Sequence, residues 1–223
     1  MRTYPIKTAD EQPLTAILND SGLLRVSGSG VNEEWTTPDD VPWKEERSLI
    51  RSVRFDGNVQ VENLTNWFFG CDNLIEIENW PEKAVKLQAV CCDCHKLKVL
   101  PHIFPNSLED MDEAFIRCDS LESVPELPPR VKYAADAFAD CFVLAGSITI
   151  CSPIEQFAYM LQNAGKNGTG IIVDYTASGA GIIDQVLATK ADGKVKKGTL
   201  IKTSRYEPNH FIRTAQKSPP VGQ

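Results

Sequence analysis

The sequence contains few of the residues that most enzymes use for catalysis. Only three histidines occur among its 223 residues, His95, His102 and His210. None of them has a serine, cysteine or carboxylate partner at a spacing typical of a nucleophile motif. The stretch from Asn163 to Gly170 is rich in glycine but lacks the lysine and hydroxyl spacing of a phosphate-binding loop. We therefore predict no catalytic residue, no cofactor and no enzymatic activity.

Long apolar runs are also missing. No segment approaches the roughly 20 apolar residues that a membrane-spanning helix requires, so we expect no membrane insertion. The opening residues, MRTYPIKTADEQPLTA, lack the apolar centre of a secretion signal. We expect a protein that acts where it is made, travels as part of a particle, or has lost an export signal.

Basic residues are scarce over most of the chain. Residues 1–149 carry a net charge of −11, residues 150–223 carry +4, and the whole chain carries −7. Contacts with phosphates need clustered lysine and arginine, so we expect no nucleic-acid partner. The one basic cluster is interpreted as a solvated loop face and comprises Lys190, Lys194, Lys196, Lys197 and Lys202.

The seven cysteines are an odd number, which excludes a fully paired disulfide framework within one chain. The segment CCDCH at residues 91–95 holds residue types that zinc prefers, but it contains no CxxC pair and no second pair follows downstream. We predict no metal site there and interpret Cys94 as a buried packing residue. A zinc-dependent enzyme that uses this segment is the alternative.

A repeat of 23 to 24 residues runs through the middle of the chain. Cys71, Cys94, Cys118 and Cys141 follow one another at intervals of 23, 24 and 23 residues, and a leucine follows each of them by three. A phenylalanine precedes three of these cysteines by three residues, and Cys91 holds that position in the remaining copy. The expected repeat core comprises Phe68, Cys71, Leu74, Cys94, Leu97, Phe115, Cys118, Leu121, Phe138, Cys141 and Leu144.

Each copy predicts two short elements. Apolar residues fall at positions i, i+3, i+7 and i+10, which is the stripe of a short helix. The segment that follows, such as LKVL or LESV, is apolar at its ends and usually meets proline, which is typical of a short strand. A unit of this size cannot bury both faces alone and must stack on its neighbours. We predict an α/β repeat fold, a short solenoid of about five strand-plus-short-helix coils.

The regions around the repeat suggest caps at both ends. Residues 1–46 predict a β-rich N-terminal cap with a hairpin turn from Asn19 to Gly22. Residues 47–170 hold the coils, and residues 171–202 predict an α/β C-terminal cap of strand, helix, turn at Asp192 and Gly193, and strand. Residues 203–223 are expected to form an extended tail that frays or docks on a partner.

The segments DEAFIRCDSLESVPELP and ADAFADCFVL resemble the BspA-like branch of the leucine-rich-repeat families, whose copies are approximately apolar, aromatic, Cys, two residues and Leu. The entry segments GLLRVSGSG and VPWKEERSLIRSVRFDG add to the resemblance, which covers about residues 14–201. Departures are Cys91 in the phenylalanine column and Ala164 in the cysteine column. The resemblance implies a leucine-rich-repeat solenoid and a bacterial surface or phage-associated protein.

These patterns predict a non-catalytic module for protein binding or scaffolding. Its partner is expected to be another protein or a surface glycan, with assembly partners if it belongs to a phage or phage-like particle. A structural or receptor-binding role in a virion is one setting, and an adhesin-like domain at the bacterial cell surface is the alternative. Function is expected in residues that break the period, and the candidate contact residues are Trp67, Trp80, His102, Phe104 and Tyr133.

Overall fold

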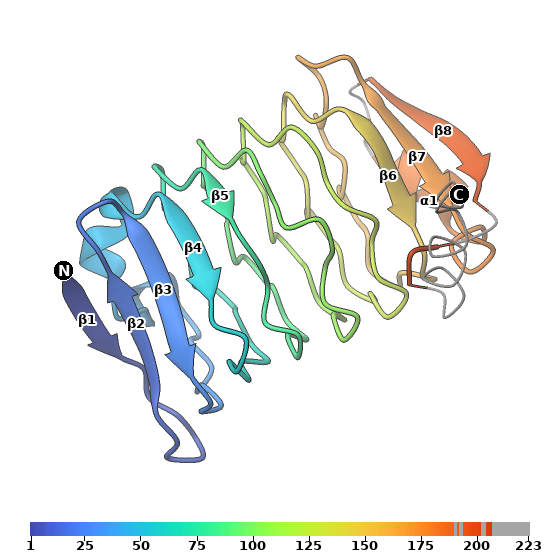
Figure 1. The fold of residues 1–223 in the computed structure, drawn as a ribbon. Helices are drawn as coiled ribbons and strands as arrows, with labels where there is room; N and C mark the ends of the chain where they lie inside the picture. The colour runs from blue at the N-terminus through green and yellow to red at the C-terminus, as the bar shows by residue number, and fades with distance from the viewer. Residues whose placement is uncertain (190, 192–193, 202–203, 207–223) are drawn as a thin grey trace, which may run out of the picture.

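The chain folds into a solenoid of about seven turns, in which successive coils stack side by side from the N-terminal to the C-terminal end (Figure 1). The computed structural model describes residues 1–189, 191, 194–201 and 204–206. The coils repeat at 23 to 24 residues, and each contributes one short extended segment to the same side of the stack. The repeat of the sequence is therefore a repeat of the structure.

Two sheets mark the ends of this row of extended segments. The first has the strand order β1-β2-β3-β4-β5, and its strands are β1 (Arg2–Pro5), β2 (Leu14–Leu18), β3 (Leu23–Gly28), β4 (Ser52–Phe55) and β5 (Glu76–Ile77). The second has the order β6-β7-β8, with β6 (Gly146–Ile150), β7 (Ile171–Tyr175) and β8 (Val195–Leu200). Strands β3 to β5 and β6 to β8 run parallel, as stacking of like coils requires.

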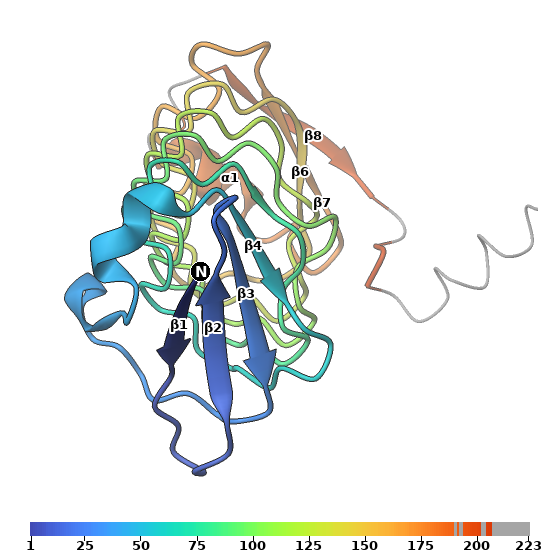
Figure 2. The same cartoon turned by 60° about the vertical axis from the view of Figure 1, so that its left-hand side comes forward.

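The N-terminal end is covered by antiparallel strands, which Figure 2 shows side by side at the near end of the stack. The turn from Asn19 to Gly22 joins β2 to β3, with Leu14 paired to Gly28 and Leu18 to Leu24. Gly22 has a φ of +90°, and a Cβ there would lie 2.7 Å from the backbone oxygen of Leu49, so this turn requires glycine. Two 3-10 helices, η1 (Pro38–Asp40) and η2 (Lys44–Leu49), lead into β4.

The short helix predicted in each coil does not form, and the segment is a run of turns. Leu64 and Phe68 donate their backbone N–H groups to carbonyl oxygens of the next coil, those of Lys86 and Val90, at 2.9 and 2.8 Å. The N–H of Trp67 turns back to the carbonyl of Leu64 at 3.2 Å. Some backbone N–H groups thus donate to the neighbouring coil and others close the local turn. In an α-helix, the N–H groups would instead donate to carbonyl oxygens four residues earlier in the same segment.

Positive φ angles explain how these turns close. Asn66 has a φ of +64° and Gly70 a φ of +68°, each at the third position of a four-residue turn, as a type II turn requires. Successive turns of four residues and an α-helix share the spacing i, i+3, i+7 and i+10, so the apolar stripe alone could not separate them. Within the described residues the only α-helix is α1 (Ile183–Ala188), on the connection from β7 to β8.

The repeat columns line the interior of the stack. All eleven residues expected in the repeat core are fully buried. The thiols of Cys94, Cys118 and Cys141 each donate to a backbone carbonyl of the preceding coil, at 3.0 to 3.1 Å. A small side chain with a weak donor suits this column because the neighbouring backbone passes so close.

The predicted C-terminal cap consists of further elements of the same parallel stack. Strands β7 and β8 extend the row that β6 begins, so the solenoid continues beyond residue 170. Helix α1 replaces the turns on this last connection and buries Ile183 and Val186. The predicted turn at Asp192 and Gly193 lies outside the described residues. Most of the predicted tail, from residue 207 onward, lies outside them as well.

Candidate functional site

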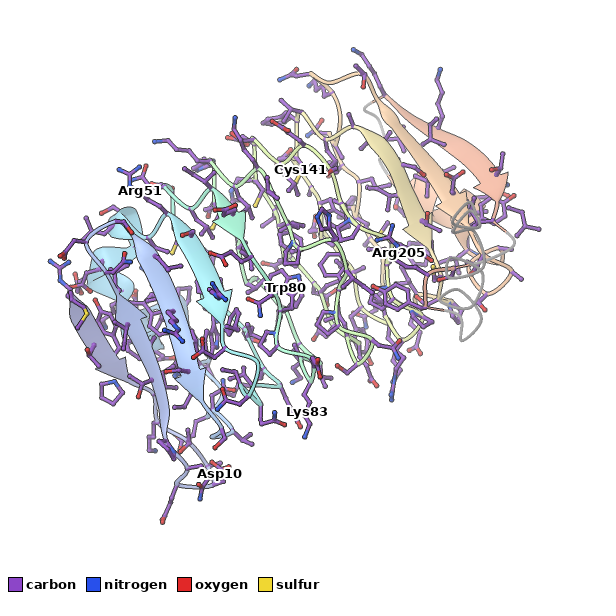
Figure 3. All side chains as sticks on the ribbon, viewed as in Figure 1. Asp10, Arg51, Trp80, Lys83, Cys141 and Arg205 are labelled. Atoms are coloured by element: carbon purple, nitrogen blue, oxygen red, sulfur yellow. The ribbon has the colours of Figure 1, made fainter. Side chains whose placement is uncertain are left out.

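Three of the five candidate contact residues meet in one place. Trp80, His102 and Phe104 line an open hollow of about 580 Å³ on the side of the stack where the extended segments end. Figure 3 shows Trp80 near the middle of the stack. We name this feature the Trp80 hollow, and its lining residues are Glu78, Asn79, Trp80, Glu82, Pro101, His102, Ile103, Phe104, Pro105 and Asn106.

The other two candidates lie elsewhere. Trp67 is 1% exposed and packs within the N-terminal aromatic cluster, 5.0 Å from the ring centroid of Trp35 and 5.4 Å from that of Trp43. The indole N–H of Trp43 donates to the carbonyl of Trp67 at 2.9 Å. The backbone of Tyr133 belongs to the ladder between coils, where its carbonyl accepts from the N–H of Met111 at 2.9 Å. Neither residue borders the Trp80 hollow.

A break in the repeat creates the hollow. Leu97 and Leu108 stand 11 residues apart, whereas the matching pairs that begin at Leu74, Leu121 and Leu144 stand 10 apart. The extra residue makes the interval from Cys94 to Cys118 one residue longer than its neighbours. Pro101 and Pro105 flank this insertion, and proline restricts the backbone on both sides. The coil therefore bulges where the strand row ends.

The rings that form the floor of the hollow pack against the core of the stack. The ring of Trp80 stacks on that of Phe104 at 6.3 Å between centroids and 22° between planes. Phe104 in turn lies 6.1 Å from Phe115, which belongs to the phenylalanine column. Trp80 is 7% and Phe104 1% exposed, so these rings support the surface, while Ile103 is 46% exposed and presents its side chain to solvent.

Carboxylates form the rim. Glu78 and Glu82 are exposed, and the carboxylate of Glu78 lies 3.7 Å from the guanidinium of Arg54 in the neighbouring strand. The lining residues include neither lysine nor arginine. Exposed apolar surface bordered by negative charge favours a ligand that carries both an apolar group and a positive charge.

A segment from the far end of the chain contacts the backbone of two residues that line the hollow. Arg205, which is labelled in Figure 3, donates from Nη1 to the carbonyl oxygen of His102 at 2.7 Å. Tyr206 donates its hydroxyl to the carbonyl of Phe104 at 3.1 Å. Glu126 accepts the backbone N–H of Arg205 at 3.2 Å. Burial raises the pKa of the Tyr206 phenol, which keeps this donor protonated.

Sequence reasoning missed Glu78, Glu82, Ile103, Arg205 and Tyr206. Ile103 lies in the 11-residue interval between Leu97 and Leu108, which was the signal that could have located it, whereas Glu78 and Glu82 lie in the preceding coil. The contacts of Arg205 and Tyr206 span about a hundred residues and leave no local pattern.

The CCDCH segment divides between the core and the surface. Cys91 and Cys94 are fully buried, while Cys92 lies under Arg117, whose guanidinium forms a bidentate pair with Asp93. Burial raises the pKa of the Cys92 thiol to about 12. Among the residues that the structure describes, no three metal-ligating side chains converge.

His95 turns outward from that segment. Its Nδ1 lies 2.9 Å from a carboxylate oxygen of Asp119 in the next coil, and both side chains are more than 40% exposed. The pair therefore joins two coils at the surface.

The basic cluster lies on the last strand. Lys196 and Lys197 are exposed on β8, and Nζ of Lys197 lies 2.7 Å from a carboxylate oxygen of Asp184. Lysine on an edge strand hinders pairing with another chain. Lys190 and Lys202, the first and last residues of the predicted cluster, lie outside the described residues. In the described part of the chain, no helix has the length and hydropathy to cross a membrane.

The stacked coils define a solenoid repeat protein, and the Trp80 hollow is its candidate binding surface. No protein-family model matches the sequence, and neither does any curated protein. Among solved structures, the chain is similar to the crystal structure of a leucine-rich repeat protein from Eubacterium ventriosum ATCC 27560, with 15% identity and a TM-score of 0.48. The similarity covers 78% of this chain and 44% of that chain, less than half its length. A likeness this distant carries no statement about binding or activity.

Proposed function

We propose that the chain is a non-catalytic protein-binding module of the leucine-rich-repeat type, in its BspA-like branch, and that it binds an extended peptide segment in the Trp80 hollow. One observation carries this proposal: exposed Ile103 and the carboxylate-bearing residues Glu78 and Glu82 line one hollow, whose floor consists of buried rings. The hollow lies at a coil that carries an extra residue between Leu97 and Leu108.

The geometry favours a peptide over a glycan. Sugars stack on exposed aromatic faces, but Trp80 and Phe104 are at least 93% buried and offer little face to a ligand. Ile103 instead offers aliphatic surface, which binds the apolar side chains of a protein partner. The carboxylates of Glu78 and Glu82 select lysine or arginine beside that apolar group.

The setting is part of the proposal. The module serves as a structural or receptor-binding component of a phage or phage-like particle, or as an adhesin-like domain at the bacterial cell surface. The same recessed site suits both settings, because each requires recognition of a protein surface without chemistry.

Binding of defined peptides tests the proposed site. The probes are fluorescent ten-residue peptides that combine phenylalanine or isoleucine with arginine, together with versions in which glutamate replaces arginine. Fluorescence anisotropy with the full chain should show binding of the basic peptides and little binding of the acidic ones. Ile103→Asp should weaken binding at least tenfold, because it places a charge at the centre of the apolar surface.

The matched control is Ile75→Asp. Ile75 is 40% exposed, close to the 46% of Ile103, but it does not line the hollow. This variant should bind the basic peptides as the unmodified chain does. Equal binding of acidic and basic peptides, or equal effects of the two aspartate variants, would refute the peptide site.

A further inference from the structure

The chain after β8 turns back along the stack, one coil at a time. Its backbone and side chains contact the ends of successive extended segments in reverse order. The contacts are Ile201 N–H to Tyr175 O at 2.8 Å, Cys151 Sγ to Ser204 Oγ at 3.6 Å, Arg205 N–H to Glu126 Oε2 at 3.2 Å, and Tyr206 hydroxyl to Phe104 O at 3.1 Å. Residues 201 and 204–206 thus lie along the stack from the last coils towards the middle of the solenoid.

The next position on this path is the Trp80 hollow. Tyr175, Cys151 and Glu126 are separated by 24 or 25 residues, and Trp80 precedes Phe104 by 24, so Trp80 ends the adjoining extended segment. Neighbouring strands lie about 4.8 Å apart. An extended residue spans about 3.3 Å. Phe211 stands five residues beyond Tyr206, so the chain is long enough for its apolar pair to reach the hollow.

The sequence that follows Tyr206 has the composition the hollow favours. Residues 207–223 are EPNHFIRTAQKSPPVGQ, in which Phe211 and Ile212 adjoin Arg213. The apolar pair matches the surface around Ile103, and the arginine matches the carboxylates of Glu78 and Glu82. Lys217 adds a second positive charge to the segment.

We infer that residues 207–223 are an intramolecular ligand of the Trp80 hollow and compete there with the peptide of a partner. The inference rests on the hollow being the peptide site proposed above. Attachment at Tyr206 gives the tail an effective concentration in the millimolar range, so a partner must displace it. A partner peptide then binds only if its affinity for the hollow exceeds that of the attached tail.

Two full-length chains test this inference, the unmodified one and a Phe211→Asp, Arg213→Glu variant that keeps every described contact. The probe is a fluorescent peptide with the sequence of residues 207–223. The variant should bind this peptide at least tenfold more tightly than the unmodified chain, whose own tail occupies the hollow. Adding Ile103→Asp to the variant should abolish binding, and adding Ile75→Asp should leave it unchanged.

Hydrogen exchange gives a second measurement that needs no added peptide. Amides in residues 101–108 should exchange several-fold faster in the tail variant than in the unmodified chain, while amides in residues 61–71 should not change. If protection of residues 101–108 instead rises with protein concentration, the tail acts between two molecules and the intramolecular assignment is wrong.

The outcomes separate the two proposals. Equal binding of the 207–223 peptide by both chains, or none by either, overturns the inference. If the tail variant still binds the basic ten-residue peptides in that case, the hollow remains a peptide site and only the tail assignment fails. If it binds neither kind of peptide, both proposals fail.

Discussion

The ring of Phe115 lies parallel to that of Phe138 in the next coil, with 5.7 Å between their centroids and 3° between their planes. The repeat of one residue type at one position makes this stack possible, because equivalent side chains of stacked coils adopt the same orientation. Phe115 also lies 6.4 Å from Trp80, so the same column that holds the coils together supports the hollow.

Phe115→Ala should lower the free energy of unfolding by about 3–5 kcal/mol, because it leaves a cavity beneath the hollow and removes the ring stack. Denaturant unfolding measures this change. A double-mutant cycle with Phe138→Ala should give a coupling of about 0.5–1.5 kcal/mol, the magnitude typical of an aromatic pair. Strictly additive effects would show that the two rings contribute independently.

Glu113→Gly should stabilise the protein by about 1 kcal/mol. Glu113 has a φ of +57° at the third position of a turn, and its side chain is exposed, so glycine relieves backbone strain without removing a core contact. The control is Glu122→Gly, another exposed glutamate with no positive φ, which should destabilise by about 0.5–1 kcal/mol. Thermal or denaturant unfolding distinguishes the two signs, and a loss of stability for both would contradict the strain argument.

The buried cysteines should make the fold sensitive to alkali. Burial raises the thiol pKa of Cys71, Cys91, Cys118 and Cys141 above the ordinary value. Below about pH 8.5 these thiols are protonated in both states, and their contribution is fully present. Above that pH the unfolded thiols ionise while the folded ones do not, which lowers stability by about 1.4 kcal/mol per pH unit for each thiol.

Urea unfolding between about pH 8.5 and pH 10 measures this slope. Cys141→Ala should lower the free energy of unfolding at every pH. It should also reduce the dependence of that free energy on pH by about 1.4 kcal/mol per pH unit, the contribution of one thiol. A slope that does not change in this variant would show that other groups cause the alkaline loss.

Arg117→Ala should make Cys92 accessible to thiol reagents. The guanidinium of Arg117 pairs with Asp93 and lies 3.7 Å from the sulfur of Cys92, which is 2% exposed. Burial is the largest cause of the high thiol pKa, and removing this cover should expose the thiol to the reagent. Mass spectrometry after maleimide treatment of the folded variant should show one added label, which Cys92→Ala should remove.

The sequence by itself determined the period and the buried columns. Apolar residues that recur every 23 to 24 positions must face the same interior when coils stack, which explains why the sequence alone assigns Phe68, Cys94 and Leu121 to one core. The turn at Gly22 follows from local chemistry in the same way, because its backbone conformation suits glycine.

Only the tertiary structure decided how each coil closes and where the site lies. The backbone N–H groups of Leu64 and Phe68 donate hydrogen bonds to the next coil, and the spacing of nearby residues does not encode these partners. Because of these bonds, the segment forms turns in place of the expected helix. Trp80 and Phe104 meet because adjacent coils stack, and Tyr206 reaches them from a hundred residues away. Periodicity reports which side of the chain is buried, whereas these contacts depend on which segments become neighbours once the coils are assembled.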